Sequence, residues 1–134
     1  IGREQLKKAD LFIENRRENA KTFKDLMGLD SRWMLQEEIG ESTWFGFAIL
    51  LLSRDKVIPE LMKKGIECRP IVAGDFTKNP VIKFMEHRIV GSLPSTNLID
   101  KCGFFVGNDS SNLAKEITYL HSIMNKIVKI VVIE

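Results

Sequence analysis

The sequence has few cysteines, few histidines and almost no excess charge. Cys68 and Cys102 stand far apart without a CxxC spacing, which favours a reduced thiol pair over a disulfide framework. Neither His87 nor His121 lies at a ligand spacing from a cysteine, so the sequence predicts no metal site. Twenty Lys and Arg against eighteen Asp and Glu leave a net charge of +2, which is too small to predict binding of nucleic acid or an anionic membrane.

Long apolar runs and secretion signals are missing as well. The longest apolar run, residues 45–52, suits a buried strand and is far short of a membrane span. A charged helical pattern opens the chain in place of a signal peptide, so we expect a cytoplasmic protein. Position 1 is not Met, which leads us to expect a piece of a longer protein. The 134 residues, 44% of them hydrophobic, predict one globular domain.

Motifs of common catalytic sites are absent too. The sequence contains neither GxGxxG nor a Walker loop, and it shows no recognisable pairing of a nucleophile with a base. Three acidic residues, Glu37, Glu38 and Glu41, are interpreted as a solvated turn. The residues by themselves therefore show no complete catalytic motif.

What is present begins with a helical pattern over residues 3–27. Apolar residues recur at spacings of three and four, interrupted by Arg16, and Gly28 supplies the stop. The predicted inward residues are Leu6, Ala9, Ile13, Ala20, Phe23 and Met27. At roughly 37 Å this helix is longer than a small domain needs. It is either a bridge to material outside this chain or an ordinary core helix.

Strand and helix signals alternate through the remainder. Strands are expected near residues 33–35 and over 44–52, the latter central and apolar on both faces, with Gly46 marking a bulge or a close approach. A helix capped by Ser53 or Asp55 ends at Gly65. The pattern then predicts a strand around Arg69, a short helix over 80–86, an edge strand over 87–90, a helix from Ser95 to Gly103, a strand over 104–107 and a last helix to about 129.

This order predicts an α/β sandwich with a three- or four-stranded sheet and helices mainly on one face. Residues 130–133 either continue the last helix or form a strand. The inward face of that helix is predicted to hold Leu113, Ile117, Leu120, Met124 and Ile127.

The most informative stretch is residues 65–80, GIECRPIVAGDFTKNP. It predicts a strand that runs into a glycine-containing loop, where binding groups often lie. Arg69 carries a planar cation suited to phosphate or carboxylate, although an ion pair with Glu67 or Asp75 explains it equally well. Phe76 either stacks on a base or sugar, or packs on its own domain. Asn79 is first a helix cap.

Three stretches together resemble a known family: WFGF at residues 44–47, the stretch 65–80, and IDKCGFFVGN at residues 99–108. They are similar to the C-terminal part of nucleotide-sugar 3-dehydratases in the DegT/DnrJ/EryC1/StrS sugar aminotransferase family. Members acting on GDP-linked sugars are the more similar, and those acting on CDP-linked sugars come next. The resemblance implies the small C-terminal domain of an aspartate-aminotransferase-like fold, with a connector helix over residues 1–28 and the small domain over 29–134.

The resemblance also implies an activity that this chain does not carry alone. Family members are dimers that use pyridoxamine phosphate or pyridoxal phosphate (PLP) and remove the 3-hydroxyl of a 4-keto-6-deoxy sugar in deoxysugar synthesis. Their catalytic histidine and cofactor site lie in the N-terminal domain, so we expect neither in this chain. The expected partners are that domain, a second subunit and a GDP- or CDP-linked sugar. A sugar aminotransferase domain and a free-standing α/β binding module remain alternatives.

The resemblance implies that six residues line the substrate cleft: Arg69, Gly74, Phe76, Asn79, Trp44 and Phe45. One position departs from the family, because Asp75 stands where members usually carry Asn. A carboxylate beside a nucleotide diphosphate would repel it, so either Asp75 points away or the substrate differs.

Overall fold

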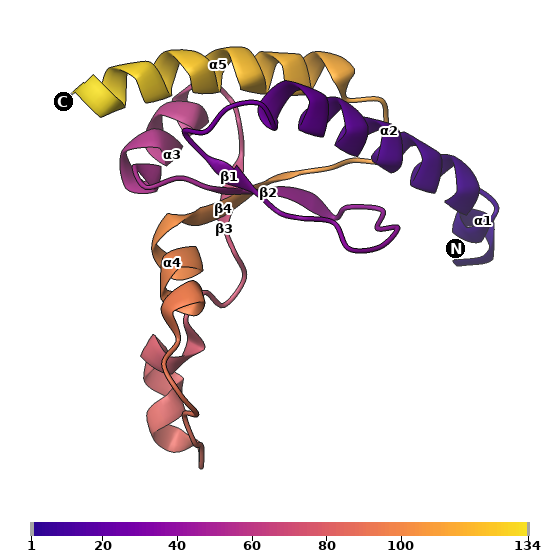
Figure 1. Ribbon diagram of the computed structural model, residues 1–134. Coiled ribbons are helices and arrows are strands. Elements are labelled where there is room, and N and C mark those ends of the chain that lie inside the picture. The colour runs from indigo at the N-terminus through magenta and orange to yellow at the C-terminus, as the bar shows by residue number, and fades with distance from the viewer. Residues whose placement is uncertain (1, 134) are drawn as a thin grey trace.

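The computed structural model describes residues 2–133, and their side chains to residue 130. A four-stranded antiparallel sheet in the order β1-β2-β4-β3 is covered on one face by three helices (Figure 1). An arm projects from it, formed by the segment between β3 and β4, residues 71–102. The strands are β1 Met34–Leu35, β2 Gly46–Leu50, β3 Cys68–Pro70 and β4 Gly103–Gly107. The helices are α1 Gly2–Leu6, α2 Ala9–Met27, α3 Arg54–Lys63, α4 Pro94–Cys102 and α5 Ala114–Ile133, with 3-10 turns η1 Phe76–Lys78 and η2 Pro80–Phe84. The predicted sandwich with a small sheet is confirmed.

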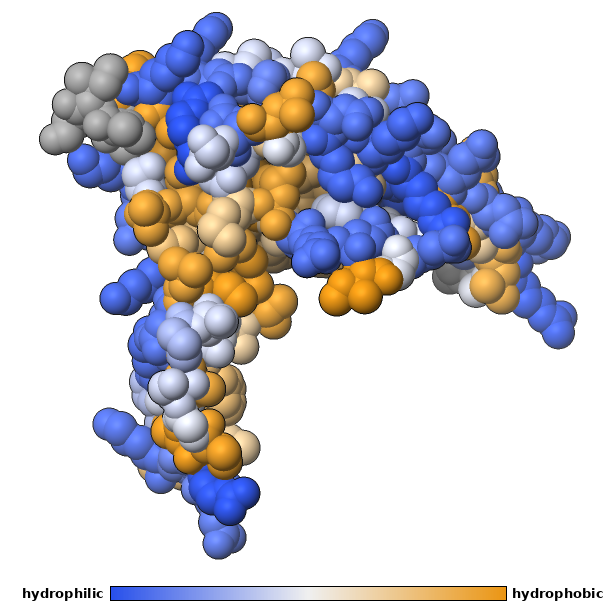
Figure 2. All heavy atoms as spheres, in the orientation of Figure 1, coloured by the Kyte–Doolittle hydropathy of each residue, from blue (hydrophilic) through white to orange (hydrophobic). Residues whose placement is uncertain are grey.

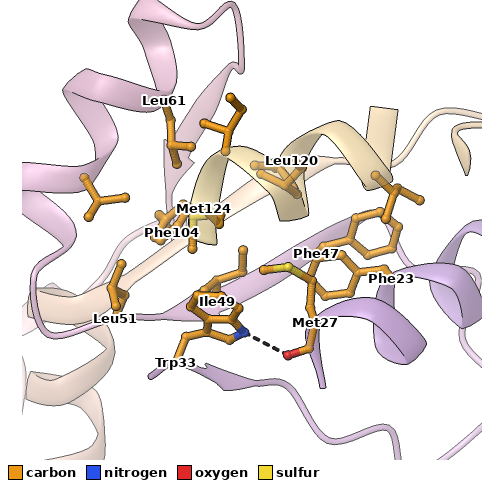
Figure 3. Close-up of a cluster of buried hydrophobic side chains, with 14 of the residues drawn as sticks. Phe23, Met27, Trp33, Phe47, Ile49, Leu51, Leu61, Phe104, Leu120 and Met124 are labelled. Carbon is orange, nitrogen blue, oxygen red and sulfur yellow. Dashed lines mark hydrogen bonds between the residues drawn. The ribbon is translucent and has the colours of Figure 1, made fainter. Parts of the chain in front are cut away.

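The core lies between the sheet and helices α2, α3 and α5 (Figure 3). Phe23 of α2 stacks on Phe47 of β2 with ring centroids 4.3 Å apart, and Trp33 donates its indole N–H to the Met27 carbonyl at 2.9 Å. The predicted inward face of the last helix is confirmed, since Ile117, Leu120, Met124 and Ile127 are buried and Leu113 is half-buried. Burial of these faces is the main force that holds the helices on the sheet.

The predicted single helix over residues 3–27 is interrupted at residues 7–8, which form a turn between α1 and α2. Only the second half of α2 joins the core, because Ala20, Phe23 and Met27 are buried. Leu6 is 73% exposed, Leu11 56% and Ile13 37%. The apolar face of the predicted helix thus extends beyond the part of the domain that covers it. The predicted stop at Gly28 is confirmed, and a side chain there would lie 2.6 Å from the Lys24 carbonyl oxygen.

Three local predictions are wrong. Strand β2 is central but only one of its faces is buried, since Ala48 and Leu50 on the other face are half-exposed. Residues 87–90 form no strand, because they lie in the arm beside no hydrogen-bonding edge. Helix α4 begins at Pro94, with Leu93 in the capping position, so Ser95 does not cap it. The fixed backbone angle of proline suits the first helical position, which explains this start.

The end of the chain is helical as far as it is described, because α5 continues through Ile133. Among residues 2–133, none of the helices combines the length and the apolar character that crossing a bilayer requires.

Candidate functional site

The face of the sheet opposite the helices carries a row of residues from three strands. Ala48 of β2 lies beside Phe105 of β4, which lies beside Arg69 of β3. The Phe105 ring leans over Gly46, where an added side-chain carbon would lie 2.8 Å from the ring. Gly46 therefore marks the close approach that the sequence predicted, because any larger side chain at this position would collide with the Phe105 ring.

A groove of about 940 Å³ opens beside this row. Phe45, Phe105 and Arg69 line it together with the first turns of α5. Phe45 is 78% exposed, and its ring lies 5.8 Å from the Phe105 ring at an angle of 50°. Two aromatic rings beside a guanidinium can bind a flat, anionic molecule, because the rings offer a stacking face and the cation a charge-assisted hydrogen bond. The structure thus brings two predicted site residues, Arg69 and Phe45, to one groove.

Arg69 forms the ion pair that was one of its two interpretations. Its guanidinium donates to Glu67 Oε1 at 2.8 Å, and no contact with Asp75 is present among the described residues. The side chains are 68% and 73% exposed. Exposed pairs of this kind contribute roughly 0–1 kcal/mol. A phosphate or carboxylate ligand can therefore compete for Arg69 at little cost to the fold.

Trp44 is buried and contacts the core, so its side chain does not line the groove. Its indole N–H donates to Glu38 Oε2 at 2.7 Å, and this hydrogen bond is the main reason that the pKa of Glu38 lies below its ordinary value. Glu37 and Glu41 are exposed as predicted, whereas Glu38 is half-buried. Trp44 thus fixes the loop that leads to Phe45.

The remaining predicted site residues lie in the arm. Gly74 has a backbone φ of +55°, which favours glycine. Phe76 is 44% exposed and lines a small hollow of about 330 Å³ with Met85 and His87. Asn79 caps η2, accepting from the Val81 N–H at 3.0 Å. These residues follow Arg69 directly along the chain, but they do not line its groove.

Asp75, which we expected to depart from the family pattern, is buried. Its Oδ1 accepts from the Thr77 N–H at 3.1 Å and the Thr77 hydroxyl at 2.6 Å, and its Oδ2 lies 3.5 Å from Lys78 Nζ. The hydrogen bond from Thr77 is the main cause that lowers the pKa of Asp75. The carboxylate is thus turned away from solvent, so it leaves no exposed charge to repel an anionic ligand.

Two groups near the groove were missed as functional candidates. Arg16, predicted only as a break in an apolar helix face, lines the groove, and its Nε is buried without a hydrogen-bond partner. Asn108 is buried and donates to the carbonyls of Trp44 at 2.9 Å and Arg16 at 3.2 Å. A polar residue inside an apolar helical face was the available signal for Arg16, whereas no pattern showed that Asn108 meets both segments.

The described residues do not fit a pyridoxal-type cofactor by themselves. Neither histidine lines the groove; His87 contacts the Met85 carbonyl at 2.9 Å and His121 contacts Asn125 at 2.9 Å. Of the cations in the lining, Arg69 pairs with Glu67. Within residues 2–133, no three His, Cys, Asp or Glu side chains are grouped to hold a metal ion.

Comparison with known families and proteins shows a consistent similarity. Residues 1–107 match the DegT/DnrJ/EryC1/StrS aminotransferase family. The chain is 46% identical over 132 residues to GDP-4-keto-6-deoxy-D-mannose 3-dehydratase of Yersinia pseudotuberculosis, covering 94% of this chain and 34% of that protein. It is 40% identical over 130 residues to the enzyme of the same name from Escherichia coli O55:H7, covering 92% and 34%.

Solved structures show the same similarity in three dimensions. An E. coli GDP-4-keto-6-deoxy-D-mannose 3-dehydratase with bound hydrated PLP superposes with a TM-score of 0.87 at 40% identity, covering 91% of this chain and 33% of that one. A ColD variant with bound GDP-perosamine gives a TM-score of 0.88 at 39% identity, covering 92% and 33%. DesV of S. venezuelae, at 15% identity and a TM-score of 0.81 over 94% and 34%, shares the fold. The chain spans about a third of the length of the curated relatives it matches.

Proposed function

Because this chain belongs to the DegT/DnrJ/EryC1/StrS aminotransferase family, we propose that it is the C-terminal domain of a nucleotide-sugar 3-dehydratase. The whole enzyme would remove the 3-hydroxyl of a GDP-linked 4-keto-6-deoxy sugar in cytoplasmic deoxysugar synthesis. The carrying observation is 46% identity that covers 94% of this chain but 34% of the relative. The proposed organisation is a connector over residues 1–28 and a small domain over 29–134, joined to a cofactor domain within a homodimer.

Exposed apolar side chains support a partner domain. They occur on α1 and the first half of α2, where Leu6 is 73% exposed, and along the arm, where Phe84 is 87% and Val90 67% exposed. Figure 2 shows apolar side chains gathered at the junction of the arm with the body and along the arm. Surfaces of this kind mark interaction sites, because burying them releases ordered water. They favour a domain with a partner over a free-standing module.

Cofactor chemistry belongs to the other domain in this proposal. Pyridoxamine phosphate, or PLP, would supply the electron sink when bound there. The residues of this chain would bind and orient the sugar nucleotide. Arg69 would donate to the diphosphate or another anionic group, and Phe45 would offer a ring face to the base or sugar. The GDP-perosamine bound to the related ColD variant is what favours a GDP-linked over a CDP-linked substrate.

Substitution of Arg69 in the full-length enzyme tests this role. Loss of a charge-assisted hydrogen bond costs about 1.5–3 kcal/mol, so Arg69→Ala should raise KM for the GDP-linked 4-keto sugar by about 10-fold or more. Arg17→Ala is the matched control, since Arg17 is also an exposed arginine near a carboxylate, with its Nη2 3.6 Å from Glu41 Oε2, and it lies outside the groove. An unchanged KM for Arg69→Ala would return Arg69 to a purely structural role.

The domain assignment is tested on the isolated chain. We expect it to show no cofactor absorbance and no turnover, and to bind a hydrophobic dye or self-associate in size-exclusion chromatography. Stoichiometric binding of pyridoxamine phosphate would overturn the assignment. A monomer that binds no dye would instead support a free-standing module. A lysine in place of histidine at the cofactor position of the preceding domain would indicate an aminotransferase.

A further inference from the structure

The loop that contains Gly74, Phe76 and Asn79 is held by one side chain from outside it. Asp100, near the end of α4, accepts from the Asp75 backbone N–H at 3.0 Å through Oδ1. Its other oxygen, Oδ2, accepts from Lys78 Nζ at 2.8 Å. The two oxygens of one carboxylate therefore hold the two ends of the turn that presents Phe76.

Gly74 lies directly against the same carboxylate. A side-chain carbon at this position would lie 2.2 Å from Asp100 Oδ1, a distance that no real contact reaches. The backbone φ of +55° also disfavours any residue with a side chain. Gly74 is thus explained by the space that Asp100 needs, and it requires no contact of its own with a substrate.

Charges around Asp100 are arranged to keep it ionised and in place. Lys78 lies between Asp100 and the buried Asp75, and its hydrogen bond is the main cause that lowers the pKa of Asp100. Arg54 of α3 donates to the backbone carbonyls of Asp100 and, at 3.1 Å, Gly103. This arginine ties the end of α4 to the body of the domain. A continuous set of contacts therefore runs from α3 through Asp100 to the loop.

We propose that Asp100 is a positioning residue that fixes the loop 74–79 relative to the sheet, and that this loop, which lies outside the groove of Arg69, contacts the sugar nucleotide through Phe76. The part that concerns the sugar nucleotide rests on the proposed function; the part that concerns the loop does not. Asp100 acts through the Asp75 N–H and the Lys78 ammonium, and it makes no contact with substrate.

Two measurements separate these parts. Hydrogen–deuterium exchange on this chain reports the opening of the loop, and steady-state kinetics of the full-length enzyme report substrate binding. Asp100→Asn preserves shape but loses the charge that pairs with Lys78. We expect the amides of Asp75 and Thr77 to exchange about tenfold faster, and KM to rise several-fold while kcat changes little. Asp25→Asn on the exposed side of α2 is the matched carboxylate-to-amide control.

Further variants keep the test decisive. Lys78→Met should accelerate the same amides, and by more than Asp100→Asn, because it also removes the Lys78 contact with the buried Asp75, 3.5 Å away. Gly74→Ala should have the same effect on exchange, since its methyl group displaces Asp100.

Unchanged exchange in Asp100→Asn would overturn the proposal. Faster exchange with an unchanged KM would overturn the positioning role toward substrate. A full-length protein that fails to act on any GDP- or CDP-linked 4-keto sugar would instead refute the proposed function, and exchange alone would then decide the role of Asp100 in the loop.

Discussion

The attachment of helix α2 to the rest of the domain depends on one buried amide, and Asn19→Ala tests this dependence. Asn19 is 2% exposed on α2. Its Nδ2 donates to Asn108 Oδ1 at 3.0 Å, to the Ser111 carbonyl at 2.8 Å and to the Asp109 carbonyl at 3.3 Å. Its Oδ1 accepts from the Leu113 N–H at 2.9 Å. One side chain thus satisfies four polar groups in the segment between β4 and α5.

The cost follows from the groups left without a partner. Each buried polar group that loses its hydrogen bond costs about 1–3 kcal/mol, although those near the rim recover part of it from water. The truncated side chain also leaves a small cavity. We therefore expect Asn19→Ala to lower the free energy of unfolding by about 3–5 kcal/mol, a large part of the stability of a small domain.

The measurement is urea unfolding followed by tryptophan fluorescence, since Trp33 and Trp44 are both buried. Asn15→Ala is the matched control on the same helix, because Asn15 donates a single hydrogen bond, to the Ser110 carbonyl at 2.8 Å, and is half-buried. It should cost about 1 kcal/mol. Equal losses for Asn15→Ala and Asn19→Ala would refute the reasoning that the buried amide holds α2.

Three further predictions concern charge, reactivity and packing. The hydrogen bond from Arg32 lowers the pKa of Asp30 to about 2. This pair therefore stabilises the fold above about pH 4, and the stabilisation is lost as the pH falls toward 2. Asp30→Asn should flatten the pH dependence of the urea midpoint between these two pH values. Burial raises the pKa of Cys68 to about 11, so iodoacetamide at pH 8 should modify it far more slowly in the folded than in the unfolded protein, and equal rates would contradict this. Gly46→Ala should cost about 1–3 kcal/mol because its methyl group meets the Phe105 ring and a backbone oxygen, each at 2.8 Å; an unchanged urea midpoint would argue against this contact.

Sequence patterns predicted the elements whose cause is local. Asn79 before Pro80 predicted the start of η2, and Gly65, with a φ of +77°, predicted the end of α3. Spacing along α5 predicted its buried face, because one face of a helix must cover whatever lies beneath it. The wrong predictions concern segments whose structure depends on a neighbouring segment. Residues 87–90 were predicted as an edge strand, but in the described residues they pair with no strand of the sheet. The outer face of β2 is apolar, but no helix covers it and its residues are half-exposed.

The same division applies to the candidate site. Sequence alone singled out Arg69 as a cation at a strand end, and three stretches, at residues 44–47, 65–80 and 99–108, indicated the family. It could not say whether Arg69 pairs with Glu67 or Asp75, because both lie close in sequence and only the backbone path separates them. It also gave no sign of Asp100, whose partners lie 22 and 25 residues away.

Periodicity, caps and glycines in this sequence determined which segments become helices and strands, because those preferences act over a few residues. Only the tertiary structure decided that Phe45 and Arg69 share a groove, that Trp44 turns inward, and that Asp75 is buried against Lys78. Those outcomes depend on which distant strands pair and which charges meet after burial. Such contacts depend on how the whole chain packs, so no short stretch of sequence predicts them.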